Sequence, residues 1–166
     1  DFERAVRVHQ HLLERADLRA ADRHRAQHAL ADDFMKAGLF DRAEAAYKAL
    51  EGTAFDGEAR LALLSLHERA RDWRAATEVA SELERRGSGS FATRIAHYAC
   101  ELALQADAAG QASQAEQELQ RARSLAPRAL RPMLLTGQRL ARAGNPAAAL
   151  LQWDQMLAQQ PEAWPL

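Results

Sequence analysis

The sequence has a single cysteine, Cys100, and almost no net charge. One cysteine cannot build an intrachain disulfide framework or a four-thiolate metal site, and it is typical of a reducing compartment. The 22 Lys and Arg residues nearly balance the 23 Asp and Glu residues. The chain therefore has no bulk electric field that would draw it to nucleic acid or to anionic lipid.

Long apolar runs are also missing. No stretch approaches the roughly 18 consecutive apolar residues of a membrane-spanning helix, and no secretory signal opens the chain. The first residue is Asp1 and not Met, and the periodic pattern begins in the middle of a repeat. We therefore expect the chain to be a fragment of a longer protein.

What the sequence does have is helical periodicity in pairs, seen most clearly in QHALADDFMKAGLFDRAEAAYKAL. Small Ala31 and Ala43 would let two helix backbones approach closely, with Phe34 and Tyr47 filling the space around them. Gly38 falls between the two helices, where a turn can use a residue without a Cβ. This order of residues resembles the tetratricopeptide repeat.

The same positions recur along the chain. The close-contact residue of each first helix falls at 31, 64, 103 and 137, and the small residue of each second helix at 5, 43, 76, 115 and 149. Successive positions are 33, 39 and 34 residues apart in the first set and 38, 33, 39 and 34 in the second, close to the period of about 34 residues of tetratricopeptide repeats. Leu64 is an exception, because the pattern expects a small residue there. No stretch of alternating β-branched residues indicates a β-strand. The sequence predicts an all-α fold, a right-handed superhelical solenoid of antiparallel helix pairs.

We expect one array over residues 1–166, beginning with a half repeat at 1–16. Four complete repeats follow, at about 19–51, 57–86, 91–126 and 128–160. Their helices are expected at 19–37, 40–51, 57–70, 73–86, 91–109, 112–125, 128–143 and 146–159. In the half repeat, Ala5, Val8 and Leu12 are expected to share the packed face. Asn145 and Pro146 look like an N-cap and a first-turn proline, and GSGS at 87–90 looks like a helix stop and linker.

Two phrases go beyond the repeat pattern: AGLFDRAEAAYKAL at 37–50 and RIAHYACELALQ at 94–105. Both resemble segments of the lipopolysaccharide assembly protein B (LapB) family. ERAVRVHQHLLERADL at the start of the chain and WRAATEVASELERRG fit the same family, so the resemblance spans the chain. Tyr98, Cys100 and Glu101 are the most telling residues, because the repeat pattern does not dictate them.

The resemblance implies a function that the residues alone do not. LapB proteins are bacterial, with an N-terminal membrane helix, a cytoplasmic tetratricopeptide array and a C-terminal rubredoxin-like module that holds a metal with four cysteines. They restrain lipopolysaccharide synthesis by promoting degradation of the LpxC deacetylase by the FtsH protease. By this resemblance we expect a cytoplasmic adaptor whose parent is anchored to the inner membrane, through an anchor outside this chain. Self-association stays open, and the alternative is a generic tetratricopeptide adaptor or structural spacer in an unrelated complex.

The residues suggest no chemistry of their own. No Ser-His-Asp order, Gly-rich phosphate loop or HExxH motif occurs, so we expect no enzyme activity. His24 and His28 could share a zinc ion on one helix face, as could His97 and Cys100, but neither pair has an evident third ligand. We expect no metal and no cofactor in this chain. His67 replaces an aromatic residue and is expected to be packed.

The expected binding surface is the concave face of the array, lined by the outward side of each first helix. Its predicted lining is Arg25, His28, Asp32, Met35, Lys36, Glu58, Leu61, Ser65, Arg69, His97, Cys100, Leu104, Asp107, Arg131, Leu134, Gln138 and Arg142. The mixture of charges with Leu and Met favours a protein or peptide partner and not nucleic acid. His28 and Asp32 stand where co-chaperone arrays need a Lys and an Asn to grip an acidic C-terminus. The central contacts are expected at Leu61, Arg69, Leu104, Arg131 and Leu134, with both arginines exposed.

Overall fold

The computed structural model describes residues 2–159, and in that range it contains nine α-helices and no strand. The helices are α1 (Phe2–Leu13), α2 (Ala20–Lys36), α3 (Phe40–Lys48), α4 (Asp56–Ala70), α5 (Trp73–Arg85), α6 (Ala92–Ala108), α7 (Ala112–Leu125), α8 (Leu130–Arg142) and α9 (Pro146–Gln159). The all-α prediction is confirmed, and most helix boundaries fall within two residues of the expected ones. The expected end of the last repeat, at residue 160, lies outside the described residues.

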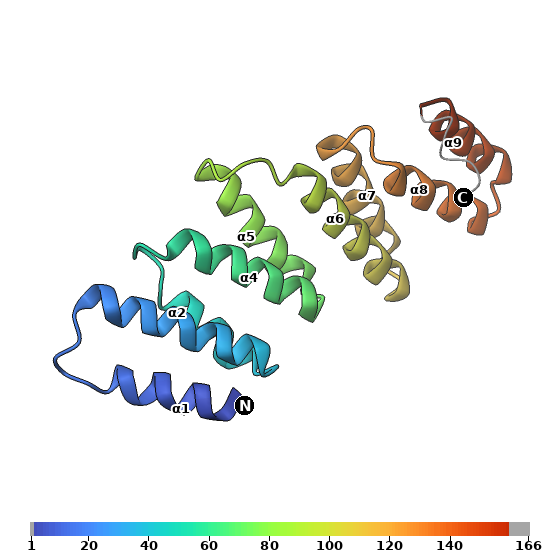
Figure 1. Ribbon diagram of the computed structural model, residues 1–166. Coiled ribbons are helices and arrows are strands. Elements are labelled where there is room, and N and C mark those ends of the chain that lie inside the picture. The colour runs from blue at the N-terminus through green and yellow to red at the C-terminus, as the bar shows by residue number, and fades with distance from the viewer. Residues whose placement is uncertain (1, 160–166) are drawn as a thin grey trace. The chain divides into compact units, whose positions relative to one another are not determined.

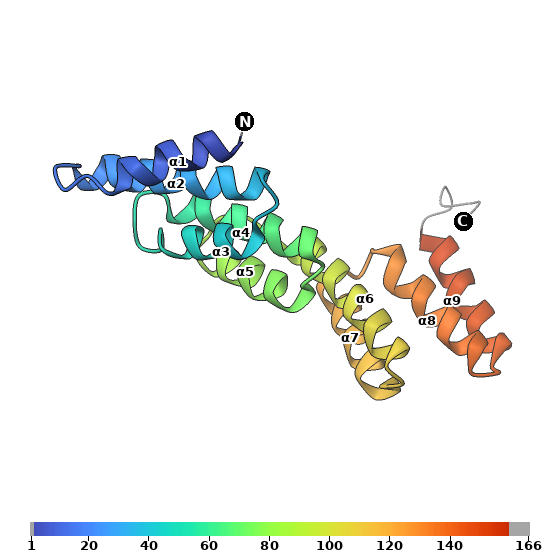
Figure 2. The same ribbon diagram turned by 90° about the horizontal axis from the view of Figure 1, so that it is seen from below.

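The helices form two compact units, residues 1–88 and 89–166. In the first unit α2 pairs with α3 and α4 with α5, while α1 packs on α2 and α3 packs on α4 (Figures 1 and 2). In the second unit α6 pairs with α7 and α8 with α9, and α8 packs against both α6 and α7. The expectation of one continuous array through both units stays a prediction.

Each helix hairpin turns at the same place, seven residues after the close-contact residue. Gly38, Gly110 and Gly144 occupy this position with φ angles of 74°, 73° and 79°. The left-handed region is open to glycine because it has no Cβ. Arg71 takes the same place between α4 and α5 with a φ of 56°. This hairpin therefore makes its turn with a residue whose Cβ disfavours the left-handed region.

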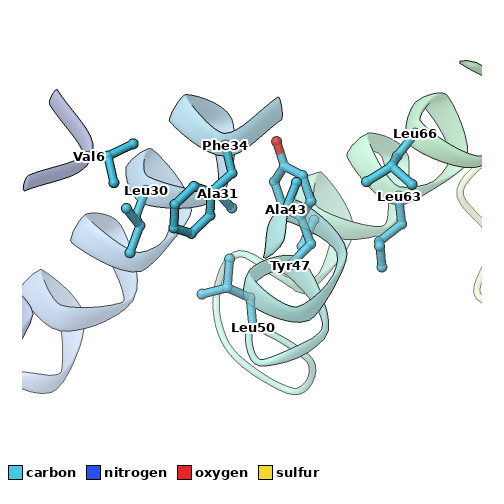
Figure 3. Close-up of a cluster of buried hydrophobic side chains, with 10 residues drawn as sticks. Val6, Leu30, Ala31, Phe34, Ala43, Tyr47, Leu50, Leu63 and Leu66 are labelled. Atoms are coloured by element: carbon cyan, nitrogen blue, oxygen red, sulfur yellow. The ribbon is translucent and has the colours of Figure 1, made fainter. Parts of the chain in front are cut away.

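The small residues predicted from the repeat are the tightest points of the core. Ala43, Ala76, Ala115 and Ala149 are completely inaccessible to solvent. Among the close-contact residues of the first helices, even the large Leu64 is fully buried. Figure 3 shows side chains of the first core cluster, which come from α1, α2, α3 and α4 and from Leu50 just after α3. The predicted register is confirmed in all four hairpins.

The close approach of α8 and α9 depends on a glycine. A Cβ on Gly137 would lie 2.2 Å from Trp153 Nε1 and 2.6 Å from Trp153 Cε2. The indole thus occupies the volume that any other side chain would need. It also donates a hydrogen bond from Nε1 to the carbonyl oxygen of Leu134, at 3.4 Å.

The packed face of α1 differs from the prediction. Val8 is 58% exposed, while its neighbour Val6 is buried, so the expected face through Val8 is wrong. The packed face runs instead through Val6 and Leu13, and on the same side His9 Nδ1 lies 2.7 Å from Oδ2 of Asp33. Asp33 is buried, and a buried carboxylate needs a hydrogen-bonding partner. An apolar periodicity count cannot detect such a polar contact.

The predicted local signals are confirmed. Asn145 caps α9, because its Oδ1 accepts a hydrogen bond from the amide of Ala148 at 3.2 Å, and the helix begins at Pro146. Residues 87–90 lie between α5 and α6 outside any helix. His67 is buried in α4, as expected for a packed histidine.

Candidate protein-interaction site

Nine of the predicted site residues lie on α2 and α4 in the first unit, and none of them is buried. Six are exposed, namely Arg25, Lys36, Glu58, Leu61, Ser65 and Arg69, and three are half-buried, namely His28, Asp32 and Met35. We call this set of nine residues the α2/α4 face. Its largest exposed apolar side chain is Leu61, which is 46% exposed.

Histidine 28 joins the two helices of this face. His28 Nδ1 lies 3.5 Å from Oδ2 of Asp32 on its own helix, and Nε2 lies 3.7 Å from Oε2 of Glu58 on α4. Its ring also contacts Phe55, with 5.4 Å between centroids, and meets Tyr47 edge-on at 6.0 Å. We call these five residues the His28 cluster.

Tyrosine 47 fixes one carboxylate of the cluster. Its hydroxyl donates a hydrogen bond to Asp32 Oδ1 at 2.6 Å. Burial of the ring raises the pKa of Tyr47 well above its usual range, and the bond to Asp32 raises it further. The hydroxyl therefore stays a donor at neutral pH and holds Asp32 in place.

The remaining predicted residues lie on α6 and α8 in the second unit. His97, Arg131 and Arg142 are exposed, and Leu104, Asp107, Leu134 and Gln138 are half-buried. Cys100 is completely buried, so its predicted place in the binding surface is wrong. It packs in an alanine-rich core cluster with Ala96 and Ala103. This burial raises the pKa of the Cys100 thiol to about 11.

Arg131 is exposed as expected, but the structure already gives its guanidinium two partners. It donates a hydrogen bond to Glu101, and its Nη1 lies 3.0 Å from Nδ1 of His97. Arg131 therefore ties α8 to α6. A charge reversal there would bring two carboxylates together, so it is a poor test of partner binding.

Sequence reasoning missed two kinds of residue. Arg139 holds Asp107 with a hydrogen bond of 2.6 Å from Nη1 to Oδ1, and it also donates to the carbonyl oxygen of Ala112. Phe55 lies just before α4 and completes the His28 cluster. No periodic signal pairs Arg139 with Asp107, because the equivalent positions of the other repeats, Met35 with Leu66 and Glu68 with Gln105, are not ion pairs, and none marks Phe55.

The described residues show neither a metal centre nor a membrane helix. Within residues 2–159, no group of three or more His, Cys, Asp or Glu side chains is placed to hold a metal ion. None of the helices α1 to α9 is long and apolar enough to cross a membrane.

Comparison with known proteins shows which proteins the chain is similar to. No protein-family model matches the chain. It is 32% identical over 163 residues to lipopolysaccharide assembly protein B of Escherichia coli K12, which covers 98% of this chain and 42% of that protein. The chain is similar in sequence to a part of lipopolysaccharide assembly protein B. The protein of that name from Haemophilus influenzae is 28% identical over 98% of this chain and 41% of its own length.

The resemblance read from the sequence is thus confirmed, and the chain spans about two-fifths of the length of these relatives. Solved structures support the fold. A crystal structure of MamA matches 98% of this chain and 90% of its own with a TM-score of 0.50 and 22% identity. A further MamA structure, labelled AMB-1, matches 99% and 85% with a TM-score of 0.51 and 15% identity. These neighbours are helical repeat proteins of the tetratricopeptide type, in agreement with the predicted fold.

Proposed function

We propose that this chain is a protein-interaction array that acts in lipopolysaccharide assembly, where it brings the LpxC deacetylase to the FtsH protease. The observation that carries the proposal is the homology to lipopolysaccharide assembly protein B along 98% of the chain. The chemistry then belongs to the partners, and this chain supplies shape and surface. The same homology supports placing the longer protein at the cytoplasmic face of the inner membrane.

The α2/α4 face supports a role in binding. Its nine residues belong to two adjacent first helices, and they combine the apolar Leu61 and Met35 with charges of both signs. Arg69 is exposed near the end of α4. Interfaces of this mixed kind draw most of their binding energy from a few central apolar and arginine contacts. We propose Leu61 and Arg69 as such contacts on this face, and Leu104 and Leu134 in the second unit.

The chain is also proposed to work without catalysis and without a bound metal or cofactor. The sequence motifs that would mark a nucleophile, a phosphate loop or a zinc protease do not occur in it. Elemental analysis of the purified chain is the direct test. Stoichiometric zinc or iron, or a melting temperature that falls with a chelator, would overturn this part of the proposal.

The binding role is tested in the full-length protein that contains this chain. Capture of LpxC and FtsH is measured for the wild type, for Arg69→Glu and for Leu61→Asp, together with the turnover of LpxC in cells. Arg74→Glu is the matched control, because Arg74 is an exposed arginine on α5, outside the α2/α4 face. We expect the two face variants to weaken capture about tenfold or more and to let LpxC accumulate, while the control changes neither. Unchanged capture by well-folded face variants would favour a structural spacer.

A further inference from the structure

The His28 cluster contains two carboxylates that share one imidazole. His28 lies between Asp32 and Glu58, and the side chains of these two acids are 40% and 69% exposed. A neutral imidazole has one N–H, which can serve only one carboxylate at a time. If the imidazole is protonated, one positive charge still faces two negative ones. The Tyr47 hydroxyl donates a hydrogen bond to Asp32 but adds no charge, so in both states the cluster keeps a net negative charge.

Other acids of the first unit already have a guanidinium. Asp22 pairs with Arg25 at 3.2 Å, and Asp56 accepts two hydrogen bonds from Arg60. Within residues 2–88, by contrast, no lysine or arginine forms an ion pair with Asp32 or Glu58. A cation from outside the chain would therefore complete this cluster.

Apolar groups beside the carboxylates narrow the choice of cation. The Phe55 ring packs against the imidazole, and Met35 and Leu61 lie one helical turn beyond Asp32 and Glu58. A guanidinium can stack on an aromatic ring while its N–H groups reach carboxylates on both sides, whereas an ammonium group is a compact, strongly hydrated point charge. The surroundings therefore favour arginine over lysine, with an apolar residue beside it.

The charges of the face also give the partner a direction. Lys36 lies one turn beyond Asp32 on α2, and Arg69 lies near the end of α4. Glu58 thus lies at the start of α4, where His28 joins it to Asp32, whereas Lys36 and Arg69 lie toward the ends of α2 and α4. A bound segment would place its arginine at the first end and an acidic residue toward the second.

We propose that the α2/α4 face docks a basic segment of a partner protein, with one arginine side chain seated in the His28 cluster between Asp32 and Glu58. The inference rests on the proposed function and adds the chemistry of the segment that is bound. It inverts the clamp of co-chaperone arrays, where a Lys and an Asn at the positions of His28 and Asp32 grip an acidic terminus.

The test uses the whole chain and a fluorescein-labelled peptide, GSLRLSEG, at low ionic strength. A second peptide carries citrulline in place of the arginine, which keeps the shape and removes the charge. We expect the arginine peptide to bind about tenfold more tightly than the citrulline peptide, because hydrogen bonds between charged groups are the stronger kind. The chain with Asp32→Asn and Glu58→Gln should lose this preference. The matched control, Glu44→Gln with Glu78→Gln, removes two carboxylates from α3 and α5 and should keep it.

Equal binding of the two peptides, no binding of either, or a preference that survives in the Asp32→Asn/Glu58→Gln chain would overturn the inference. Circular dichroism checks that this variant is folded, and Asn at position 32 keeps an oxygen that can accept the Tyr47 hydroxyl hydrogen bond. Capture of LpxC by the full-length protein separates the two proposals. Normal capture with a failed peptide test overturns this inference alone, whereas absent capture with a successful peptide test overturns the proposed function alone.

Discussion

Adding one methyl group to Gly137 should destabilise the second unit. The new Cβ would meet three atoms of the Trp153 indole at 2.2, 2.6 and 2.8 Å, all closer than packed atoms can approach. Gly137 and Trp153 are both helical, on α8 and α9, so neither backbone can move alone. The indole must leave its place and give up its hydrogen bond to Leu134.

Two opposing terms decide the magnitude. Replacing glycine by alanine inside a helix normally stabilises it by about 1 kcal/mol. Forcing extra volume into a packed contact typically costs about 1–3 kcal/mol, and a lost hydrogen bond adds about 1 kcal/mol. The clash and the lost bond together exceed the propensity gain. We therefore expect Gly137→Ala to lower the free energy of unfolding by about 1–3 kcal/mol.

The measurement is urea unfolding followed by circular dichroism and by tryptophan fluorescence. Gly57→Ala is the control, because Gly57 is also helical and a Cβ there meets no atom within 4 Å. It should be neutral or stabilising by up to about 1 kcal/mol. Trp153→Leu makes room for the methyl group, so the double variant should be more stable than the sum of the single effects predicts. If Gly137→Ala were as stable as Gly57→Ala, or if the two effects were additive, the argument from close approach would fail.

Four further outcomes are expected. Arg71→Gly should stabilise the chain by about 0.5–1 kcal/mol in thermal melts, because it relieves a left-handed φ at a non-glycine residue. Ala43→Leu should cost about 1–3 kcal/mol in the same melts, whereas the same change at exposed Ala147 should be nearly neutral. Cys100 should resist alkylation in the native chain up to about pH 9 and react fully in denaturant, since burial raises its pKa to about 11. Hydrogen bonds from Arg60 hold the pKa of Asp56 below its usual value, so its contribution to stability is present above that usual value and is lost as pH falls through the lowered pKa. Urea midpoints between pH 7 and pH 3 should therefore fall less steeply for Asp56→Asn than for the wild type.

The sequence was sufficient to predict what the repeat dictates. Helix positions, the small contacts at Ala43 and Ala149, and the turn at Gly38 follow from spacing, because backbone approach and a positive φ each admit few residue types. The cap at Asn145 follows from local hydrogen bonding in the same way. These features depend on neighbours a few residues apart, which a linear pattern contains.

Contacts between polar side chains of different helices were not predictable in this way. On α1, His9 pairs with Asp33 of α2 and Val8 is exposed, although apolar spacing equally allows a packed face through Val8. Arg131 on α8 donates a hydrogen bond to Glu101 on α6. Cys100 is buried in the core beside alanine residues. Each outcome depends on which side chain of another helix lies opposite, and the period of the repeat does not contain that information.

The repeats differ at one position that was predicted to bind partners and agree at the positions where helices touch. The position three residues before each close-contact residue is held by His28, Leu61, Cys100 and Leu134, and these side chains range from exposed to completely buried. The turn seven residues after the close-contact residue has a positive φ in every hairpin, even where Arg71 must adopt it. Packing between helices therefore constrains the close-contact and turn positions. The position three residues before each close-contact residue, the second set, is free to change. We expect recognition of a particular partner to depend on the second set, so that two homologous arrays can keep the same hairpins and differ in what they bind.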